Sequence, residues 1–588
     1  MSHRAVPALY ATAETAVPLM GETPMPRLSF EAAMNVMIRV AGEAGQGVAT
    51  TGLLLVEAFA NLGLHVAATQ SYMSRIRGGL NWYDIRIGEG PMYAGADQAD
   101  LLVAFTSAAR EILAGEVRAG GQVLFNGEAS NGVIAVDLDG AAQETGGNKL
   151  YSNTIAAGAV MELLGYDVAA MEALLGEKFK KKGPETVAAN QACARKGAEL
   201  ARPHGGKIQA PKPDGGARRE VYAGAGAIGL SAAVSGVKFA TSYPMTPGTA
   251  TFTFLASVAD RYGIVVEQAE DEIAAANMIC GAVYAGVPAM ATTSGGGFAL
   301  MAEALSLAGM LELPICVLIA QRPGPATGLP TRTAQQDLLF ALHAGHGEFP
   351  RAIFAPGTVR QCYDVTRRAL ETAHKFQTPV LILTDQFLQD FEQTIEPLSE
   401  DYAPIDRCLA ENPGADYARY AVTESGISPR AVPGGKALVI VDSDEHTPQG
   451  HLSEDLDSHT AQQDKRMRKL GGMTAEAMPP ELYGPADADM LLICWGSTYG
   501  PAREAVDLLS ARGQSAAMLH FAQVWPIGRT AAATAIGQPK RIICVEGNQT
   551  GQFAQVLRAE GLIGDVERLG KYDGLPMTGT WIAERIAK

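Results

Sequence analysis

Residues 243–331 contain four short motifs whose side chains could bind and convert a small molecule. The first, 243–249, reads Tyr-Pro-Met-Thr-Pro-Gly-Thr and follows an expected strand that ends at Ser242. Its two prolines stiffen the turn, so the Thr246 hydroxyl is presented in a defined geometry at the carboxyl end of a strand, where open α/β sheets bind ligands. An ordinary proline-rich loop explains the same seven residues about equally well.

An acidic cluster, Glu270-Asp271-Glu272, begins an alanine-rich run with helical character. The helix dipole and capping account for Glu270 and Asp271, because acidic side chains are favourable in a first helical turn. Glu272 differs, since it adjoins the alanines at 274–276, where a carboxyl group is expected to lose its contact with water. A desolvated carboxyl group of this kind could bind a ring nitrogen.

The third motif, residues 291–297, reads Ala-Thr-Thr-Ser-Gly-Gly-Gly and links an expected strand to a helix beginning near Phe298. A glycine-rich helix start can hold a phosphate through its amide groups. It can equally let a flat ring or a partner backbone approach closely. The sequence leaves both alternatives open for Thr293, Ser294 and Gly295.

The fourth motif starts at Arg322, directly after an expected strand at 315–320. The turn that follows is braced by prolines and contains Thr327 and Thr331. A guanidinium group held at a strand end is well suited to binding a carboxylate. A lone arginine is more often a surface residue, but the neighbouring threonines favour a carboxylate site.

The scaffold for these motifs is predicted to be α/β, with three domains built on parallel sheets, because 588 residues are too many for one core. We expect an N-terminal arm at 1–35, an α/β domain at 36–202, a linker at 203–219, a second α/β domain at 220–400, a connecting excursion at 401–482 and a third α/β domain at 483–588. The first domain begins with a strand at 36–40, a glycine turn and a helix at 51–62. The excursion contains an expected strand at 437–441 and a charged helical stretch near 458–470.

Bulk properties exclude several classes of protein. The formal net charge of −16 argues against binding to nucleic acid, which depends on clustered Lys and Arg. The apolar runs are too short to span a membrane and no signal peptide is evident, so a cytoplasmic protein is expected. None of the seven cysteines forms a CxxC pair with another, which argues against an iron–sulfur cluster on this chain and leaves no predicted metal site.

The order and spacing of the four motifs, followed by Gly-His-Gly-Glu-Phe-Pro at 345–350, resemble the pyrimidine-binding domain of 2-oxoacid:ferredoxin oxidoreductases. The first domain, with Gly-Glu-Ala-Gly-Gln-Gly-Val at 42–48 and Ser-Arg-Ile-Arg-Gly-Gly at 74–79, resembles the gamma module of that family. The third domain resembles its transketolase C-terminal-like module. The chain would then be a gamma module fused ahead of an alpha subunit.

The resemblance implies an enzyme that oxidatively decarboxylates a 2-oxoacid, transfers the acyl group to coenzyme A and passes electrons to ferredoxin, or runs in reverse as a carboxylating synthase. It also implies roles for single residues. Glu272 would hold N1′ of the thiamine diphosphate aminopyrimidine, and Thr293, Ser294 and Gly295 would also contact the cofactor. Thr246 and Arg322 would bind the 1-carboxylate and keto region of the substrate. Thr327 would support the arginine turn, and Thr331 could meet a distal carboxylate of the substrate.

The family's Gly-Asp-Gly motif for diphosphate and Mg²⁺, and the grouped cysteines of its [4Fe-4S] cluster, do not occur in this sequence. The resemblance therefore implies a separate beta subunit that carries both, in a dimer of alpha-beta heterodimers that is active only when complete. Among substrates, 2-oxoglutarate is favoured, giving succinyl-CoA, because the fused gamma and alpha layout is similar to enzymes of that class. Pyruvate and branched-chain 2-oxoacids remain alternatives.

Two rival interpretations start from the first domain. An NAD-dependent dehydrogenase would explain the strand, glycine turn and helix at 36–62, but Gly42, Gly45 and Gly47 give GxxGxG where a dinucleotide site needs GxGxxG. Alternatively, this domain serves only in assembly and gating, docking subunits and covering the route of coenzyme A. We expect that role for the domain, though not for the whole chain.

Overall fold

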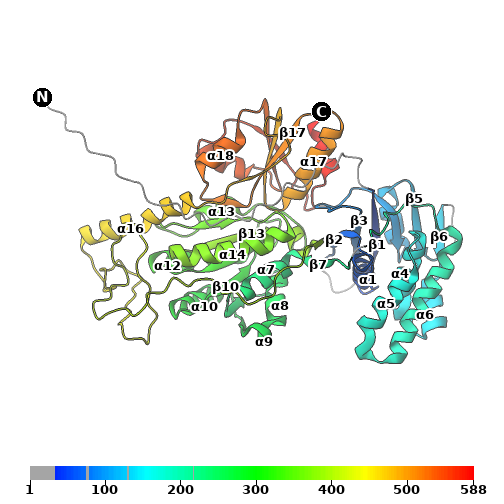
Figure 1. Ribbon diagram of the computed structural model, residues 1–588, viewed down its shortest axis with the longest axis horizontal. Helices are drawn as coiled ribbons and strands as arrows, with labels where there is room; N and C mark the ends of the chain where they lie inside the picture. Colours follow the sequence, from blue (N-terminus) through cyan, green and yellow to red (C-terminus); the bar gives the residue numbers. More distant parts are fainter. Residues whose placement is uncertain (1–33, 74–78, 129–131, 216, 588) are drawn as a thin grey trace. The chain divides into compact units, whose positions relative to one another are not determined.

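The computed structural model describes residues 34–73, 79–128, 132–215 and 217–587 (Figure 1). The expected arm at 1–35 lies outside this part except for its last two residues, as does most of the motif at 74–79. Along the described chain, helices alternate with strands that form sheets of eight, seven and five strands. The predicted α/β class is therefore confirmed. Among these residues no helix is both long and apolar enough to cross a bilayer.

The first sheet has the strand order β6-β5-β4-β1-β3-β2-β14-β7. Its members are β1 (Asn35–Glu43), β2 (His65–Ser71), β3 (Leu80–Gly88), β4 (Ala99–Ala104), β5 (Val117–Asn126), β6 (Val133–Val136), β7 (Glu220–Ala223) and β14 (Glu392–Ile395). Strand β1 pairs in parallel with β4 but antiparallel with β3, and β3 pairs antiparallel with β2. The sheet is therefore mixed, because consecutive strands β2 and β3 return directly instead of crossing over through a helix.

Helices cover this sheet through close packing of small residues. They are α1 (Val48–Asn61), α2 (Ser107–Leu113), α3 (Leu138–Gly146), α4 (Ser152–Leu163), α5 (Val168–Phe179) and α6 (Pro184–Ala201). Figure 1 shows α4, α5 and α6 side by side in cyan. Helices α4 and α6 approach so closely that a Cβ on Gly158 would lie 2.0 Å from the backbone oxygen of Ala194. The helix expected at 51–62 is thus found as α1, three residues longer at its start.

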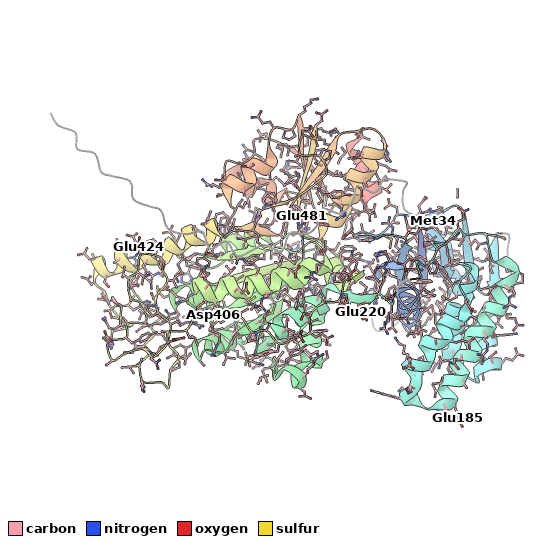
Figure 2. The ribbon with its side chains drawn as sticks, viewed as in Figure 1. Met34, Glu185, Glu220, Asp406, Glu424 and Glu481 are labelled. Carbon is pink, nitrogen blue, oxygen red and sulfur yellow. The ribbon has the colours of Figure 1, made fainter. Side chains whose placement is uncertain are left out.

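Strands β7 and β14 come from beyond the expected linker, yet they complete the first sheet. Strand β14 pairs antiparallel with both β2 and β7. A buried hydrogen bond reinforces the junction, with the Val66 N–H donating to Thr394 Oγ1 at 2.8 Å. Glu220, at the start of β7, is labelled in Figure 2 together with Met34, the first described residue. Because β14 and β2 lie more than 300 positions apart in the sequence, no local sequence pattern could have predicted their pairing.

The second sheet is the one that carries the four motifs, and its order is β18-β12-β13-β11-β10-β8-β9. Its members are β8 (Phe239–Ser242), β9 (Val265–Gln268), β10 (Ala289–Thr293), β11 (Cys316–Gln321), β12 (Ala352–Phe354), β13 (Val380–Asp385) and, from the third domain, β18 (Gln523–Trp525). All its pairings are parallel except that of β12 with β18. Strands such as β11 and β13 are buried along their whole length, as expected for a parallel sheet covered on both faces.

Two layers of helices bury the second sheet. Apolar side chains of α10 (Glu272–Tyr284) and α12 (Ala302–Met310) pack on one face, and those of α7 (Gly224–Val234) and α14 (Val359–Phe376) pack on the other. The shorter helices of this region are α8 (Thr249–Ser257), α9 (Ala259–Tyr262), α11 (Gly295–Leu300), α13 (Leu338–His343) and α15 (Gln386–Asp390). This layering fixes the strand ends and holds the loops that follow them in place.

The third sheet has the order β15-β17-β16-β19-β20 and is parallel except for its edge strand β15. Its strands are β15 (Glu481–Tyr483), β16 (Met490–Trp495), β17 (Ala516–Phe521), β19 (Arg541–Glu546) and β20 (Glu567–Gly570); its helices are α17 (Tyr499–Ala511), α18 (Arg529–Ile536), α19 (Gln552–Ala559) and α20 (Gly579–Ile586). The alternation of strands and helices expected of an α/β domain at 483–588 is found here.

The excursion at 401–482 is mostly irregular. The prediction of a strand at 437–441 is wrong: this apolar run forms no ladder, and Leu438 is 76% exposed. A strand needs a neighbour to satisfy its backbone, and none of the described strands lies beside this run. The helix expected near 458–470 is confirmed as α16 (Leu456–Ala475).

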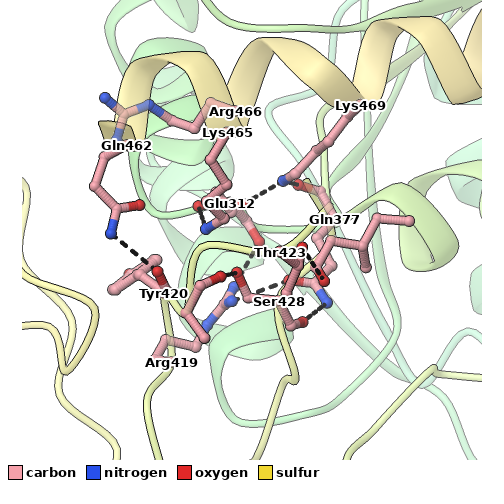
Figure 3. Close-up of polar contacts among 12 residues, drawn as sticks. Glu312, Gln377, Arg419, Tyr420, Thr423, Ser428, Gln462, Lys465, Arg466 and Lys469 are labelled. Carbon is pink, nitrogen blue, oxygen red and sulfur yellow. Dashed lines mark hydrogen bonds and ion pairs between the residues drawn. The ribbon is translucent and has the colours of Figure 1, made fainter. Parts of the chain in front are cut away.

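A buried cluster of charged side chains attaches α16 to the second domain (Figure 3). Glu312, which follows α12, is 1% exposed and forms ion pairs with Lys465 and Lys469, both on α16 and both buried. Arg419 donates to the Glu312 backbone oxygen at 2.8 Å and to Gln377 Oε1 at 2.9 Å. These cations hold the pKa of the Glu312 carboxyl at about 2, although burial alone would raise it. The excursion is thus fixed by charge where it lacks regular secondary structure.

Candidate functional site

The four motifs meet at one edge of the second sheet because four neighbouring strands end there. The strands lie in the order β11-β10-β8-β9, and all run in parallel. Arg322 follows β11, Thr293 is the last residue of β10, Thr246 lies in the loop after β8, and Glu272 opens the helix after β9. The carboxyl ends of parallel strands are where such sheets bind ligands. The sequence prediction that these motifs share a site is consistent with this arrangement.

Glu272 is the most buried acidic residue of the site, with 2% of its surface exposed. It occupies the first position of α10, after Asp271, whose carboxylate accepts a 2.7 Å hydrogen bond from the Ala274 N–H and caps the helix. Glu270 is exposed. The Glu272 Oε1 atom is buried and has no hydrogen-bond partner among the residues that the structure describes. The capping role thus falls to Asp271, and Glu272 is left available for a ligand.

Helix α11 provides a cradle of glycines beside this carboxylate. A Cβ on Gly297 would lie 2.5 Å from Glu272 Oε1 and 2.2 Å from Thr293 Oγ1, so only glycine fits there. Ser294 takes the N-cap position of α11, but its side chain makes no capping bond. Its Oγ is buried and unpartnered within the described chain. Glu272, Thr293 and Ser294 therefore surround one helical turn and present two unsatisfied polar atoms.

Arg322 and Thr246 also lie together. The Nη1 atom of Arg322 donates a hydrogen bond to the backbone oxygen of Thr246, with 2.6 Å between the two atoms. Burial lowers the pKa of the guanidinium from its ordinary value, and the charge of nearby Asp337 opposes that effect. The contact uses the Thr246 backbone and leaves its hydroxyl unengaged by Arg322. Within the described residues Arg322 donates to this one carbonyl, so most of its donors remain for an anionic ligand.

The turn after Arg322 closes on itself, with the Leu329 N–H donating to the Pro323 oxygen at 3.0 Å. Gly328 has a φ of +53° and faces that same oxygen, so another residue would not fit this bend. Thr331 is buried at the end of the turn, whereas Thr327 is exposed. Neither side chain hydrogen-bonds to another residue in the described part of the chain. The expected support of the arginine turn by Thr327 therefore finds no contact in this structure.

Asp337 is a residue of this site that the sequence did not indicate. It occupies the N-cap position of α13, where an aspartate is expected to cap the helix, yet its side chain makes no capping bond. Instead a Cβ on Gly295 would lie 2.4 Å from its Oδ2. That Oδ2 is buried and has no partner in the described residues. Burial raises the pKa of Asp337 to about 6, although Arg322 acts to lower it.

Comparison with known proteins assigns this chain to a family. Residues 231–465 match the family model "Pyruvate flavodoxin/ferredoxin oxidoreductase, thiamine diP-bdg", and residues 37–200 match "Pyruvate ferredoxin/flavodoxin oxidoreductase". The 2-oxoglutarate oxidoreductase subunit KorA of Mycobacterium tuberculosis is 30% identical, over 94% of this chain and 91% of its own. The chain belongs to the 2-oxoacid:ferredoxin oxidoreductase family. It is an alpha subunit with a gamma-like N-terminal region.

Two further relatives support the assignment to this oxidoreductase family along nearly the whole length. The 2-oxoacid:ferredoxin oxidoreductase subunit alpha of a Sulfolobus species is 29% identical over 93% of this chain and 96% of its own. The solved structure of the 2-oxoglutarate:ferredoxin oxidoreductase from Magnetococcus marinus, with 2-oxoglutarate, coenzyme A and succinyl-CoA bound, matches with a TM-score of 0.87, 33% identity and coverage of 94% of this chain and 99% of that one. All four motifs lie inside the thiamine-diphosphate-binding match. The oxidoreductase assignment therefore replaces the NAD-dependent dehydrogenase alternative.

Proposed function

We propose that this oxidoreductase subunit holds the aminopyrimidine half of thiamine diphosphate at Glu272 and binds a 2-oxoacid, preferably 2-oxoglutarate, at Thr246 and Arg322. The observation that carries the proposal is the buried, unpartnered Glu272 Oε1 packed against Gly297. A buried polar atom without a partner costs free energy, so such atoms are uncommon outside ligand sites.

The residues present fit an aminopyrimidine ring. A carboxylate can share a proton with a ring nitrogen, and the buried Ser294 Oγ offers a second unsatisfied hydroxyl beside it. Thr293 and the glycines of α11 leave space for a flat group without side chains in the way. When bound, the cofactor supplies a carbon nucleophile and accepts the electron pair released as carbon dioxide departs.

The chain's own residues would prepare both reactants. Glu272 would keep a proton at the ring nitrogen, and the hydrophobic neighbours Ala275 and Ala276 would exclude water from that contact. Arg322 would hold the 1-carboxylate of the substrate through its free donors, with the Thr246 hydroxyl near the keto group. Fixing the carboxylate in this way orients the bond that breaks.

The preference for 2-oxoglutarate rests on two supports. The relatives from M. tuberculosis and Magnetococcus marinus are named for 2-oxoglutarate. Thr331 is buried at the end of the arginine turn, where its unengaged hydroxyl could meet a distal carboxylate. Pyruvate and branched-chain 2-oxoacids would present the same 1-carboxylate to Arg322, so they remain the alternative substrates.

We further propose that electrons pass to ferredoxin, that acyl groups pass to coenzyme A, and that the enzyme is a dimer of alpha-beta heterodimers. In this assembly a beta subunit supplies the site for the diphosphate and Mg²⁺ and the [4Fe-4S] cluster. The cysteines of this chain support that division. Burial raises the pKa of both Cys280 and Cys316 to about 12, so these thiols stay protonated and are poor cluster ligands.

The test is carbon dioxide release from a labelled 2-oxoacid by the chain reconstituted with its beta subunit, thiamine diphosphate and Mg²⁺. Glu272→Gln keeps the size of the side chain but not its carboxylate, and we expect activity to fall by roughly 10² to 10⁴-fold. Glu270→Gln is the matched control: the same change on an exposed neighbour should leave activity within about twofold, since surface changes are mild. Equal activity of the Glu272 variant and the wild type would reject the proposed role.

A further inference from the structure

Two carboxylates, each with one buried oxygen that has no partner in the described residues, lie against the same short helix of the site. Glu272 packs on Gly297 and Asp337 packs on Gly295, and at either glycine a Cβ would come within 2.5 Å of a carboxylate oxygen. The two glycines are about 200° apart around the helix axis, so the carboxylates flank α11 from opposite sides. Glu272 has a proposed role, whereas Asp337 has none, although its carboxylate also lies against α11.

The placement of Asp337 is enforced by its surroundings. Its backbone N–H donates to Gln321 Oε1 at 2.9 Å, which ties it to the end of β11 just before Arg322. The Gln552 amide on α19 donates to the backbone oxygen of Gln336 at 2.7 Å and accepts from the Leu339 N–H at 3.0 Å, which fixes the start of α13 from the other side. The side chain forgoes the capping bond available at its position and keeps a buried oxygen unpaired. Such an arrangement is costly unless a charge or a ligand compensates it.

The charge that compensates Asp337 is Arg322. The guanidinium acts on the Asp337 carboxylate electrostatically, but no ion pair forms between the two. Around Asp337, the facing groups are Arg322 from the end of β11, Glu272 across α11 and the uncharged Gln552 from α19. Arg322 and ionised Asp337 together carry no net charge. A bound 2-oxoacid carboxylate would add one negative charge to this partly buried pair.

We propose that Asp337 is a positioning residue that acts through Arg322: it balances the guanidinium while the site is empty and takes up a proton from solvent when the substrate's 1-carboxylate binds. The inference rests on the proposed function, because it needs Arg322 to hold that carboxylate. The physical cause is the partial burial of the site, where a neutral group of charges is favoured over a net negative one. Substrate binding and protonation of Asp337 thereby support each other.

This coupling has a definite pH dependence. The pKa of Asp337 is raised to about 6, so below that pH the carboxyl is already protonated and substrate binds without further proton uptake. Above it, binding must bring in a proton, and KM should rise by up to about tenfold per pH unit until the pKa of the substrate-bound state is reached. The substrate's own carboxylate is ionised throughout this range and contributes no titration.

The experiment compares the reconstituted holoenzyme with its Asp337→Asn variant between pH 5.5 and 8.5, measuring KM and kcat for the preferred 2-oxoacid by carbon dioxide release. The wild type should show the rise in KM above about pH 6, whereas the variant should show a flat KM that lies roughly a hundredfold below the wild type at pH 8. The kcat profiles should stay parallel, because Glu272 is present in both proteins. A merely structural role for Asp337 would change KM and kcat together without removing the pH dependence.

A second measurement does not depend on turnover. Calorimetric titration of the wild-type complex with the corresponding 2-hydroxyacid, in buffers of different ionisation enthalpy, should show uptake of close to one proton at pH 7.5, and Asp337→Asn should show none. Asp385→Asn is the control, since Asp385 is also buried with a pKa of about 6 but accepts its hydrogen bonds from Ser497 and the start of α15. It should keep the wild-type proton uptake.

The outcomes separate this inference from the proposed function. If the wild-type complex releases no carbon dioxide, the proposed function fails and the inference fails with it. If carbon dioxide is released but KM is independent of pH between 6 and 8 in the wild type, the proposed function stands and the role of Asp337 is rejected. If the variant retains the wild-type pH dependence, another group carries the coupling and the inference is equally rejected.

Discussion

Replacing Glu312 with Gln should loosen the attachment of α16, because it removes the single carboxylate that faces three buried cations. Lys465, Lys469 and Arg419 are each no more than 2% exposed (Figure 3). Lys465 and Lys469 form ion pairs with the Glu312 carboxylate, and Arg419 donates to its backbone oxygen. A Gln side chain can still accept a hydrogen bond, but it offers no charge. The variant therefore leaves the cations without electrostatic compensation.

Two estimates of the folding free energy lost in this variant agree. The pKa of Glu312 is lowered from 4.5 to about 2, which corresponds to about 3 kcal/mol of stability in favour of the ionised form. Removing one partner of a buried ion pair typically costs about 3–5 kcal/mol. Since the folded-state pKa is depressed, this stability is present above pH 4.5 and is lost as the pH falls towards 2. At pH 7 the variant should therefore show the full loss.

Hydrogen exchange of α16 is the appropriate assay, since it reports local opening without requiring the whole chain to unfold in one step. A loss of about 3 kcal/mol should speed exchange of the amides around Lys465 and Lys469 by roughly a hundredfold. Glu476→Gln is the matched control: Glu476 ends the same helix and pairs with Lys375 at 2.6 Å, but its side chain is 37% exposed. Such a surface pair is worth about 0–1 kcal/mol, so exchange should change by fivefold at most. Unchanged protection in the Glu312 variant would refute this account of the cluster.

Three further outcomes test the site. Gly297→Ala would place a methyl group 2.5 Å from Glu272 Oε1 and should weaken the affinity for thiamine diphosphate by about tenfold or more. Gly296→Ala is the control, because its Cβ would lie 3.9 Å from Ala326 O, and it should leave the affinity unchanged. Titration of the reconstituted apoenzyme with the cofactor measures both affinities. The ratio of kcat/KM for 2-oxoglutarate to kcat/KM for pyruvate should exceed one, and it should fall towards one in Thr331→Val. A preference of the wild type for pyruvate would reject the assignment of 2-oxoglutarate as the substrate but not the role proposed for Glu272 at the cofactor. The chain purified without its beta subunit should lack the visible absorption of an iron–sulfur cluster, and a brown, redox-active preparation would contradict the proposed division between subunits.

The features that sequence predicted well are those decided by local pattern. Apolar runs fixed the positions of β8, β10 and β11, and the alanines after Glu272 indicated its burial. Because the strands are parallel neighbours, the loops after them had to meet at one edge of the sheet. The cap at Asp271 also followed from local chemistry, since an acidic residue before a helical run favours that position.

Sequence failed where the decisive contact is distant. The charged pattern of α16 is typical of a solvated helix face, yet Lys465 and Lys469 are buried because Glu312 lies about 150 residues away in sequence and directly beneath them in the fold. Asp337 resembles a helix cap by position, and only tertiary packing turns its carboxylate towards Gly295 instead. The strand expected at 437–441 had the right composition but no partner strand. In each case local propensity was overridden by what the rest of the chain brought nearby.

The glycines of α11 left two alternatives open, a phosphate grip or space for close packing, and the structure favours the second. Gly297 and Gly295 are occupied from the sides by the Glu272 and Asp337 carboxylates, while Gly296 faces open space towards Ala326. A diphosphate at this helix start would lie next to the Glu272 and Asp337 carboxylates, whose negative charges would repel it. A neutral aminopyrimidine has no such conflict, and its ring nitrogen needs a carboxylate. The charges at this edge of the sheet therefore suit the aminopyrimidine half of the cofactor better than its diphosphate, which supports the proposal that a second subunit holds the diphosphate and its Mg²⁺.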